Sequence, residues 1–130
     1  MPWLWRHVSN PSANDILVDV KARRPTDNKA FNLHGIYIAH DATSTKKYSV
    51  QTFREGTNET RGYFTITVPA NSLPFIIESD EPLIVAIGMF TGSYYEHLRI
   101  RAVDGGEPNV WIGIKLKGRW IIESGYMMYA

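Results

Sequence analysis

Two histidines six residues apart, His34 and His40, are the side chains best suited to metal or acid–base chemistry. On an extended strand they share one face but lie roughly 20 Å apart, which is too far to bind one metal ion. His40 could act as a base oriented by Asp41, with Ser44 close in sequence, but no G-x-S-x-G motif accompanies them. A polar residue at the end of a strand is therefore the better interpretation of His40.

Carboxylates are most concentrated in one turn, which contains Glu78, Asp80 and Glu81. Oxygen-rich turns can bind calcium. This turn lacks the D-x-[DN]-x-[DN]-G spacing of a calcium loop, and Pro82 indicates an ordinary turn. Glu78 and Glu123 could form the paired acids of a glycosidase only if the fold brought them together, and nothing in the sequence does so.

The chain also lacks the usual motifs of enzymes and cofactor-binding proteins. It has no cysteine, which excludes disulfides, thiolate zinc sites and cysteine nucleophiles. The Gly105-Gly106 pair lies between two predicted strands and not before a helix, so it is a turn and not a phosphate-binding loop. The sequence therefore predicts a protein that is not an enzyme, with no catalytic residues, no metal and no cofactor.

Aromatic side chains are the most informative group, with four tryptophans and seven tyrosines. In Val110–Lys117 the aliphatic residues alternate toward one face, which leaves Trp111 on the other face with Lys115 and Lys117. A tryptophan on an otherwise polar face packs under a loop or lies at a contact surface. Such aromatics anchor subunit interfaces. They also stack on sugars in carbohydrate-binding modules, for which Trp111 or the Tyr94-Tyr95 pair are the candidates here.

Both ends of the chain, residues 1–8 and 125–130, are rich in apolar and aromatic residues. Free termini are normally polar and frayed. We therefore expect at least one end to dock on a neighbouring subunit. The predicted interface residues are Trp3, Trp5, Trp111, Tyr126 and Tyr129.

Seven segments have the apolar pattern of β-strands, and none has that of a helix. The clearest is Ile16–Arg23, in which apolar residues alternate with Asp19, Lys21 and Arg23. Leu33–His40 is apolar on both faces, which suits a central strand or one at an interface. The other predicted strands are Tyr48–Phe53, Tyr63–Val68, Leu83–Phe90, Tyr95–Val103 and Val110–Lys117. Many short strands separated by turns predict an all-β fold, a single antiparallel β-sandwich of the jelly-roll type.

Two of these segments carry specific expectations. Leu83–Phe90 is apolar throughout and is expected to be the strand at the centre of the core, and Glu55–Gly62 is expected to be a long polar loop. A chain of 130 residues predicts one domain spanning 1–130. The net charge of +1, without a basic block, argues against a nucleic-acid partner. No apolar run approaches the roughly 20 residues needed to span a membrane, and the start lacks the apolar region of a secretory signal, so synthesis in the cytoplasm is expected.

Four stretches, taken in order, resemble a known group of proteins: Phe31–Ala42, Lys47–Phe53, Val68–Ala70 and Glu81–Ala86. Over residues 16–103 they are similar to small β-sandwich structural proteins of tailed-bacteriophage virions, including capsid decoration proteins. The resemblance implies a non-enzymatic protein of the virion that contacts the major coat protein or other virion proteins and assembles as a homo-oligomer. Head decoration is the first expectation and neck or tail attachment the second; a carbohydrate-binding β-sandwich module is the alternative from another class.

Overall fold

The computed structural model describes residues 2–22, 30–71, 73–88, 95–122 and 125–129. These residues form eleven β-strands and no helix. The strands are β1 (Trp3–Ser9), β2 (Ile16–Ala22), β3 (Phe31–His40), β4 (Lys46–Arg54), β5 (Glu59–Val68), β6 (Phe75–Glu78), β7 (Ile84–Ile87), β8 (Glu96–Ala102), β9 (Asn109–Lys117), β10 (Trp120–Ile122) and β11 (Met127–Tyr129).

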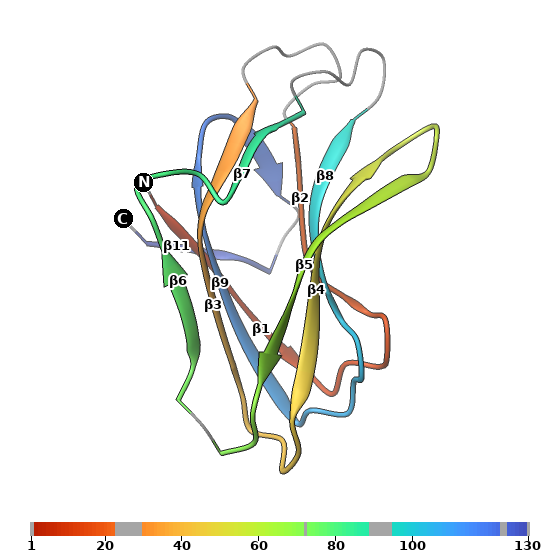
Figure 1. Ribbon diagram of the computed structural model, residues 1–130, viewed down its shortest axis with the longest axis vertical. Helices are drawn as coiled ribbons and strands as arrows, with labels where there is room; N and C mark the ends of the chain where they lie inside the picture. The colour runs from red at the N-terminus through yellow and green to blue at the C-terminus, as the bar shows by residue number, and fades with distance from the viewer. Residues whose placement is uncertain (1, 23–29, 72, 89–94, 123–124, 130) are drawn as a thin grey trace.

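Two antiparallel sheets pack face to face as a β-sandwich (Figure 1). Sheet A has the strand order β11-β1-β9-β3-β6, with β7 also paired to β3, and sheet B has the order β10-β2-β8-β4-β5. Four pairs are nested along the chain, β1 with β9, β2 with β8, β3 with β6 and β4 with β5, as in one long hairpin rolled into a sandwich. This is the jelly-roll arrangement, so the predicted fold class is confirmed.

The core lies between the sheets and is built by alternation along the central strands. Val18 and Val20 of β2, Ile36 and Ile38 of β3, and alternate residues of β9 are fully buried. Because side chains of a strand alternate between faces, the neighbouring residues of the same strands point away from the core. Burying each of these aliphatic side chains stabilises the fold by about 1.5–3 kcal/mol.

The structure contains four strands that the apolar pattern does not single out, namely β1, β6, β10 and β11. Three of them have only three or four residues, which is too short for alternation to be recognised. The prediction of a loop over Glu55–Gly62 is also wrong for the second half of that segment, because β5 begins at Glu59 and pairs with β4 from there. Its polar residues are explained by exposure, since the first seven residues of β5 face solvent.

The expectation that Leu83–Phe90 forms the centre of the core is wrong. Only Ile84–Ile87 forms a strand, β7, which pairs with β3 outside the main strand order of sheet A, and Val85 is 63% exposed. The segment's last two residues lie outside the described part of the chain. Strand β9 is central in sheet A and β8 in sheet B. Apolar composition cannot distinguish a strand buried on both faces from one at an exposed apolar edge.

Both termini belong to sheet A, where β1 lies between β9 and β11 (Figure 1). Trp3 is opposite Tyr129 and Trp5 is opposite Met127, so the two chain ends lie side by side. This pairing explains the apolar ends in part, since Leu4 is fully buried in the core. Docking of the ends on neighbouring subunits stays a prediction. Among the described residues, no helix has the length and hydropathy of a membrane span.

Candidate functional site

The outer face of sheet A carries a cluster of aromatic side chains, Trp3, Trp5, Tyr37 and Trp111, which we call the aromatic face. The register of the sheet brings them together. Trp5 of β1 is opposite Gly113 of β9, which is in turn opposite Tyr37 of β3. Trp3 lies two residues from Trp5 on β1, and Trp111 lies two residues from Gly113 on β9, so both are on the same face, on opposite sides of the Trp5–Gly113 pair. Three distant segments therefore contribute to one surface.

The indoles of Trp3 and Trp5 lie flat across the sheet. Their ring centroids are 5.4 Å apart with an interplanar angle of 21°, and Trp5 meets Tyr37 edge to face at 5.0 Å. Glycines beneath them make this possible. A Cβ atom on Gly113 would lie 2.5 Å from Cζ3 of Trp5, and one on Gly35 would lie 2.8 Å from the ring of Trp3. Without side chains at these two positions, the rings pack directly on the backbone, and both tryptophans are half-buried.

Trp111 forms one end of the aromatic face and is 41% exposed. Its ring stacks on His7 with centroids 5.6 Å apart. His7 Nε2 donates to Oδ1 of Asn109 at 2.7 Å, and Asn109 donates from its backbone and its side chain to the two carboxylate oxygens of Asp41. These hydrogen bonds from Asn109 lower the pKa of Asp41. These hydrogen bonds fix the position of the His7 ring on which Trp111 stacks.

A charged pair forms the other end, where Lys115 Nζ lies 2.5 Å from Oε1 of Glu78. Between the two ends, Ile76 of the edge strand β6 lies opposite Tyr37 and is 59% exposed. The aromatic face is therefore an apolar centre with polar and charged groups at its margin. Protein interfaces have this composition, with aromatic residues enriched at the centre and polar residues at the rim.

The structure brings three of the five predicted interface residues, Trp3, Trp5 and Trp111, onto this one face. Tyr126 does not join them: its hydroxyl accepts from the backbone N–H of Asp19 at 2.8 Å, and Arg6 lies 5.4 Å from its ring centroid. Burial raises the pKa of Tyr126. The side chain of Tyr129 lies outside what the structure describes, although its backbone pairs with that of Trp3.

Tyr37 is the member of the aromatic face that the sequence analysis did not select. The available signal was that Leu33–His40 is apolar on both faces, which suits a strand at an interface. The roles of Gly35 and Gly113 carry no signal in the sequence, because a glycine within a strand has several explanations. Only the register across β1, β9 and β3 shows that these glycines lie under indoles.

The two histidines considered for metal or acid–base chemistry, His34 and His40, form hydrogen bonds with backbone groups. His40 Nε2 donates to the carbonyl of Val68 at 2.9 Å, and its Nδ1 accepts from the N–H of Ala42 at 3.1 Å. His34 is buried, with Nδ1 3.1 Å from the carbonyl oxygen of Ser79. In the described part of the chain, no three His, Cys, Asp or Glu side chains are placed to hold a metal ion. Glu123 and Tyr94 lie outside that part.

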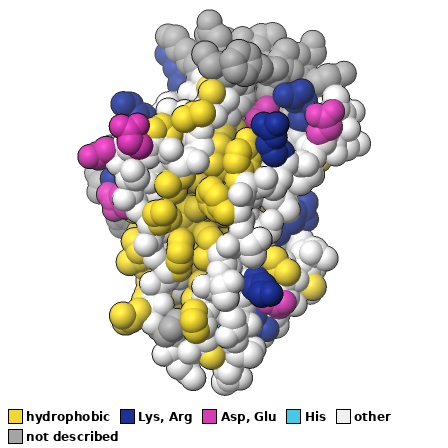
Figure 2. All heavy atoms as spheres, viewed as in Figure 1, with side chains coloured by type: hydrophobic (Ala, Val, Ile, Leu, Met, Phe, Trp, Pro, Cys, Tyr) yellow, Lys and Arg dark blue, Asp and Glu magenta, His cyan; other side chains and the backbone are white. Residues whose placement is uncertain are grey.

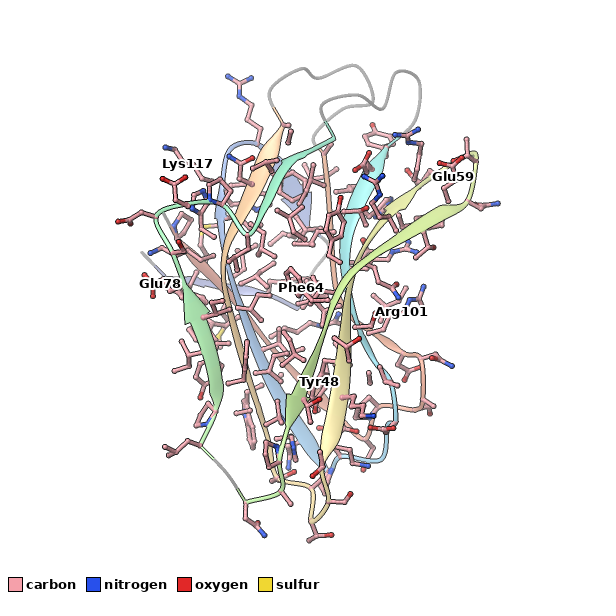
Figure 3. The ribbon with its side chains drawn as sticks, viewed as in Figure 1. Tyr48, Glu59, Phe64, Glu78, Arg101 and Lys117 are labelled. Carbon is pink, nitrogen blue, oxygen red and sulfur yellow. The ribbon has the colours of Figure 1, made fainter. Side chains whose placement is uncertain are left out.

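A second apolar feature lies at the open side of the sandwich, between the edge strands β5 and β6. Figure 2 shows hydrophobic side chains gathered down the middle of this side, and Phe64 of β5 lies at the opening (Figure 3). The cavity there measures about 270 Å³ and is lined mainly by Phe64, Ile66, Phe75, Ile77 and Leu83. Since Ile76 faces outward and the adjacent Ile77 faces the cavity, apolar surface continues around β6 from the aromatic face.

Comparison with known proteins gives little beyond the fold. No family model matches the chain, and no curated protein matches it in sequence. A solved structure of the CBM22-1 and GH10 modules of Clostridium thermocellum endo-1,4-β-D-xylanase 10B, complexed with xylohexaose, matches with a TM-score of 0.40 and 11% identity. The match covers 85% of this chain and 18% of the xylanase chain. So low a TM-score supports no conclusion about function.

Proposed function

We propose that this protein is a non-enzymatic structural protein that binds another protein through its aromatic face. The observation that carries the proposal is the placement of Trp3, Trp5, Tyr37 and Trp111 on one outward face, with two of the indoles lying flat over glycines. Tryptophan and tyrosine are enriched among the residues that dominate binding energy at protein interfaces. Rigid rings already held in place lose little conformational freedom on binding, which favours affinity.

The opening between β5 and β6 supports the same proposal. Both are edge strands, and edge strands can pair with a strand of another chain. The exposed side chains at this side include Phe64, Ile76 and Ile77. Because the opening adjoins the aromatic face at β6, one partner could cover both.

For the partner we propose the major coat protein of a tailed-phage particle, with capsid decoration as the role and the virion as the location. The resemblance of residues 16–103 to small phage β-sandwich proteins supports this choice. Neck or tail attachment is the alternative within the same class. We also propose that the protein forms a homo-oligomer, since virion proteins commonly act in symmetric groups. Light scattering on the purified protein measures its oligomeric state.

Replacing Trp111 with alanine tests the contact directly. Trp111 is exposed and its ring is absent from the core, so the variant should fold while its affinity for particles falls at least about tenfold. The measurement is occupancy on particles assembled from the coat protein encoded in the same genome, with free protein titrated. The control is Ile121→Ala, which removes another exposed apolar side chain, on β10 at the opposite edge of sheet B from β5.

Wild-type occupancy by Trp111→Ala would contradict the aromatic face as the contact. A genome that encodes no coat or portal protein would contradict the virion role. An equal loss in Ile121→Ala would show that the effect is not specific to the aromatic face.

A further inference from the structure

A polar pocket lies on the outer face of sheet B, on the opposite side of the sandwich from the aromatic face. It measures about 390 Å³. Pockets that hold small ligands are typically of about 300–1,000 Å³. Strands β2, β8 and β10 and the turn after β4 supply its lining, which consists of Asp19, Lys21, Glu55, His97, Arg99, Ile121 and Ile122.

His97 forms part of the wall and is only 7% exposed. Its Nδ1 donates to Oδ1 of Asp19 at 2.5 Å. Its Nε2 lies 3.4 Å from Oε2 of Glu55 without hydrogen-bond geometry, and is buried with no hydrogen-bond partner in the described part of the chain. A buried polar atom left unpaired costs about 1–3 kcal/mol, so native proteins rarely leave one without a role. Nε2 is therefore the ring atom left to pair with a ligand hydroxyl, which can either donate or accept a hydrogen bond.

The pocket holds two carboxylates, those of Asp19 and Glu55, and two permanently cationic side chains, those of Lys21 and Arg99. Burial raises the pKa of Asp19, but the hydrogen bond and charge of His97 and the charge of Arg99 outweigh it, so the net shift is downward and the carboxylate stays ionised. A free anion would meet two carboxylates here, and a free cation would meet two cationic groups. Neither is therefore the ligand that the pocket favours.

The pocket lining offers both hydrogen-bond donors and hydrogen-bond acceptors. Arg99 donates from Nε to Asp19 at 3.3 Å, and its guanidinium carbon lies 4.0 Å from the centroid of the Phe53 ring. Lys21 Nζ lies 4.4 Å from the ring centroid of Tyr95. Hydroxyl groups both donate and accept, so a neutral molecule with several hydroxyls matches such a lining.

Ile121 and Ile122 add an apolar wall to this polar set. A pyranose ring has the complementary shape, since it presents hydroxyls at its edge and C–H groups on its face. We infer that the pocket binds a neutral saccharide. This function goes beyond the proposed protein contact and uses the opposite face. It also moves the carbohydrate alternative away from Trp111, toward the side of the molecule where Tyr95 contacts Lys21.

Nuclear magnetic resonance titration of the ¹⁵N-labelled protein tests the inference, with maltose, lactose, cellobiose and xylobiose as neutral probes and glucuronate as the charged comparator. At least one neutral disaccharide should shift amide signals of β2, β8 and β10 and saturate by about 50 mM. Lys21→Ala should weaken that binding at least about tenfold. Lys117→Ala makes the same change of charge on sheet A and should bind as the wild type does.

Three results would overturn the inference: no saturable shift with any neutral probe, shifts confined to the strand that bears Trp111, or binding of glucuronate alone. Unchanged binding by Lys21→Ala would overturn it as well. Because Trp111→Ala tests the protein contact on the other sheet, failure of one proposal is distinguishable from failure of the other.

Discussion

Replacing Gly105 with alanine is expected to lower the free energy of unfolding by roughly 3 kcal/mol or more. Gly105 is buried and has a φ of 74°, a conformation that side chains with a Cβ rarely adopt. A Cβ atom there would lie 2.4 Å from the backbone nitrogen of Ala13 and 2.5 Å from the carbonyl carbon of Ser12. These are backbone atoms of the turn between β1 and β2, so no side chain can rotate to relieve the clash.

The neighbouring glycine provides the matched control. Gly106 has a φ of 84°, but the nearest atom to its added Cβ is the Nζ of Lys46, at 3.7 Å, which is an ordinary van der Waals contact. Gly106→Ala therefore introduces the strain of a positive φ without the clash, and should cost about 1–2 kcal/mol. Urea denaturation of both variants separates the two effects. Equal losses would show that the contact with the β1–β2 turn contributes nothing.

This loop also matters for the proposed contact. It leads directly into β9, which carries Trp111 and begins at Asn109, the hydrogen-bond partner of His7. The N–H of Gly106 donates to the carbonyl of Pro11 at 2.7 Å and so ties the loop to the β1–β2 turn. The loop before β9 thus positions both the start of that strand and the His7 ring on which Trp111 stacks.

Local pattern was enough to predict the fold class. In β2 and β9 the alternating apolar residues are buried, and the residues between them, such as Asp19 and Trp111, face outward as expected. Alternation is a property of the strand itself, so it can be read from consecutive residues. The outward position of Trp111 was predicted on the same basis.

Features that depend on strand register could not be predicted. The aromatic face requires β1, β9 and β3 to pair so that Trp5, Gly113 and Tyr37 are adjacent. The polar pocket requires Asp19 to meet His97, 78 residues away in the chain. Local pattern does not say which strands pair or with what offset.

The failed expectation for Leu83–Phe90 has a related cause. Hydrophobic residues fill cores, but they also cover contact surfaces, and composition alone does not separate the two. Val85 is exposed on β7, as Ile76 is on β6 and Phe64 is on β5. A strongly apolar segment is therefore as informative about the surface of a protein as about its core.

Tyr48→Phe is the second substitution with a large expected effect, a loss of roughly 2–3 kcal/mol of stability. Tyr48 and Glu107 are both fully buried, and the tyrosine hydroxyl donates to Oε2 of Glu107 at 2.7 Å. The other carboxylate oxygen has no hydrogen-bond partner in the described part of the chain. Phenylalanine would therefore leave a buried carboxylate with neither oxygen bonded. Glu107→Gln is the control, because its side-chain oxygen still accepts from Tyr48.

The same pair predicts a loss of stability in alkali. Burial, and then the hydrogen bond and charge of Glu107, raise the pKa of Tyr48 well above its ordinary value of about 10. Above about pH 10 the unfolded chain releases this phenolic proton while the folded chain retains it, so stability is full below that pH and falls as the pH rises. Urea midpoints measured from pH 8 to about pH 11 should fall less steeply in Tyr48→Phe than in the wild type. Some slope should remain, because the pKa of Tyr126 is also raised by burial. Identical slopes in the two proteins would mean that Tyr48 does not keep its proton in the folded state, and that Glu107 is held by something other than this hydrogen bond.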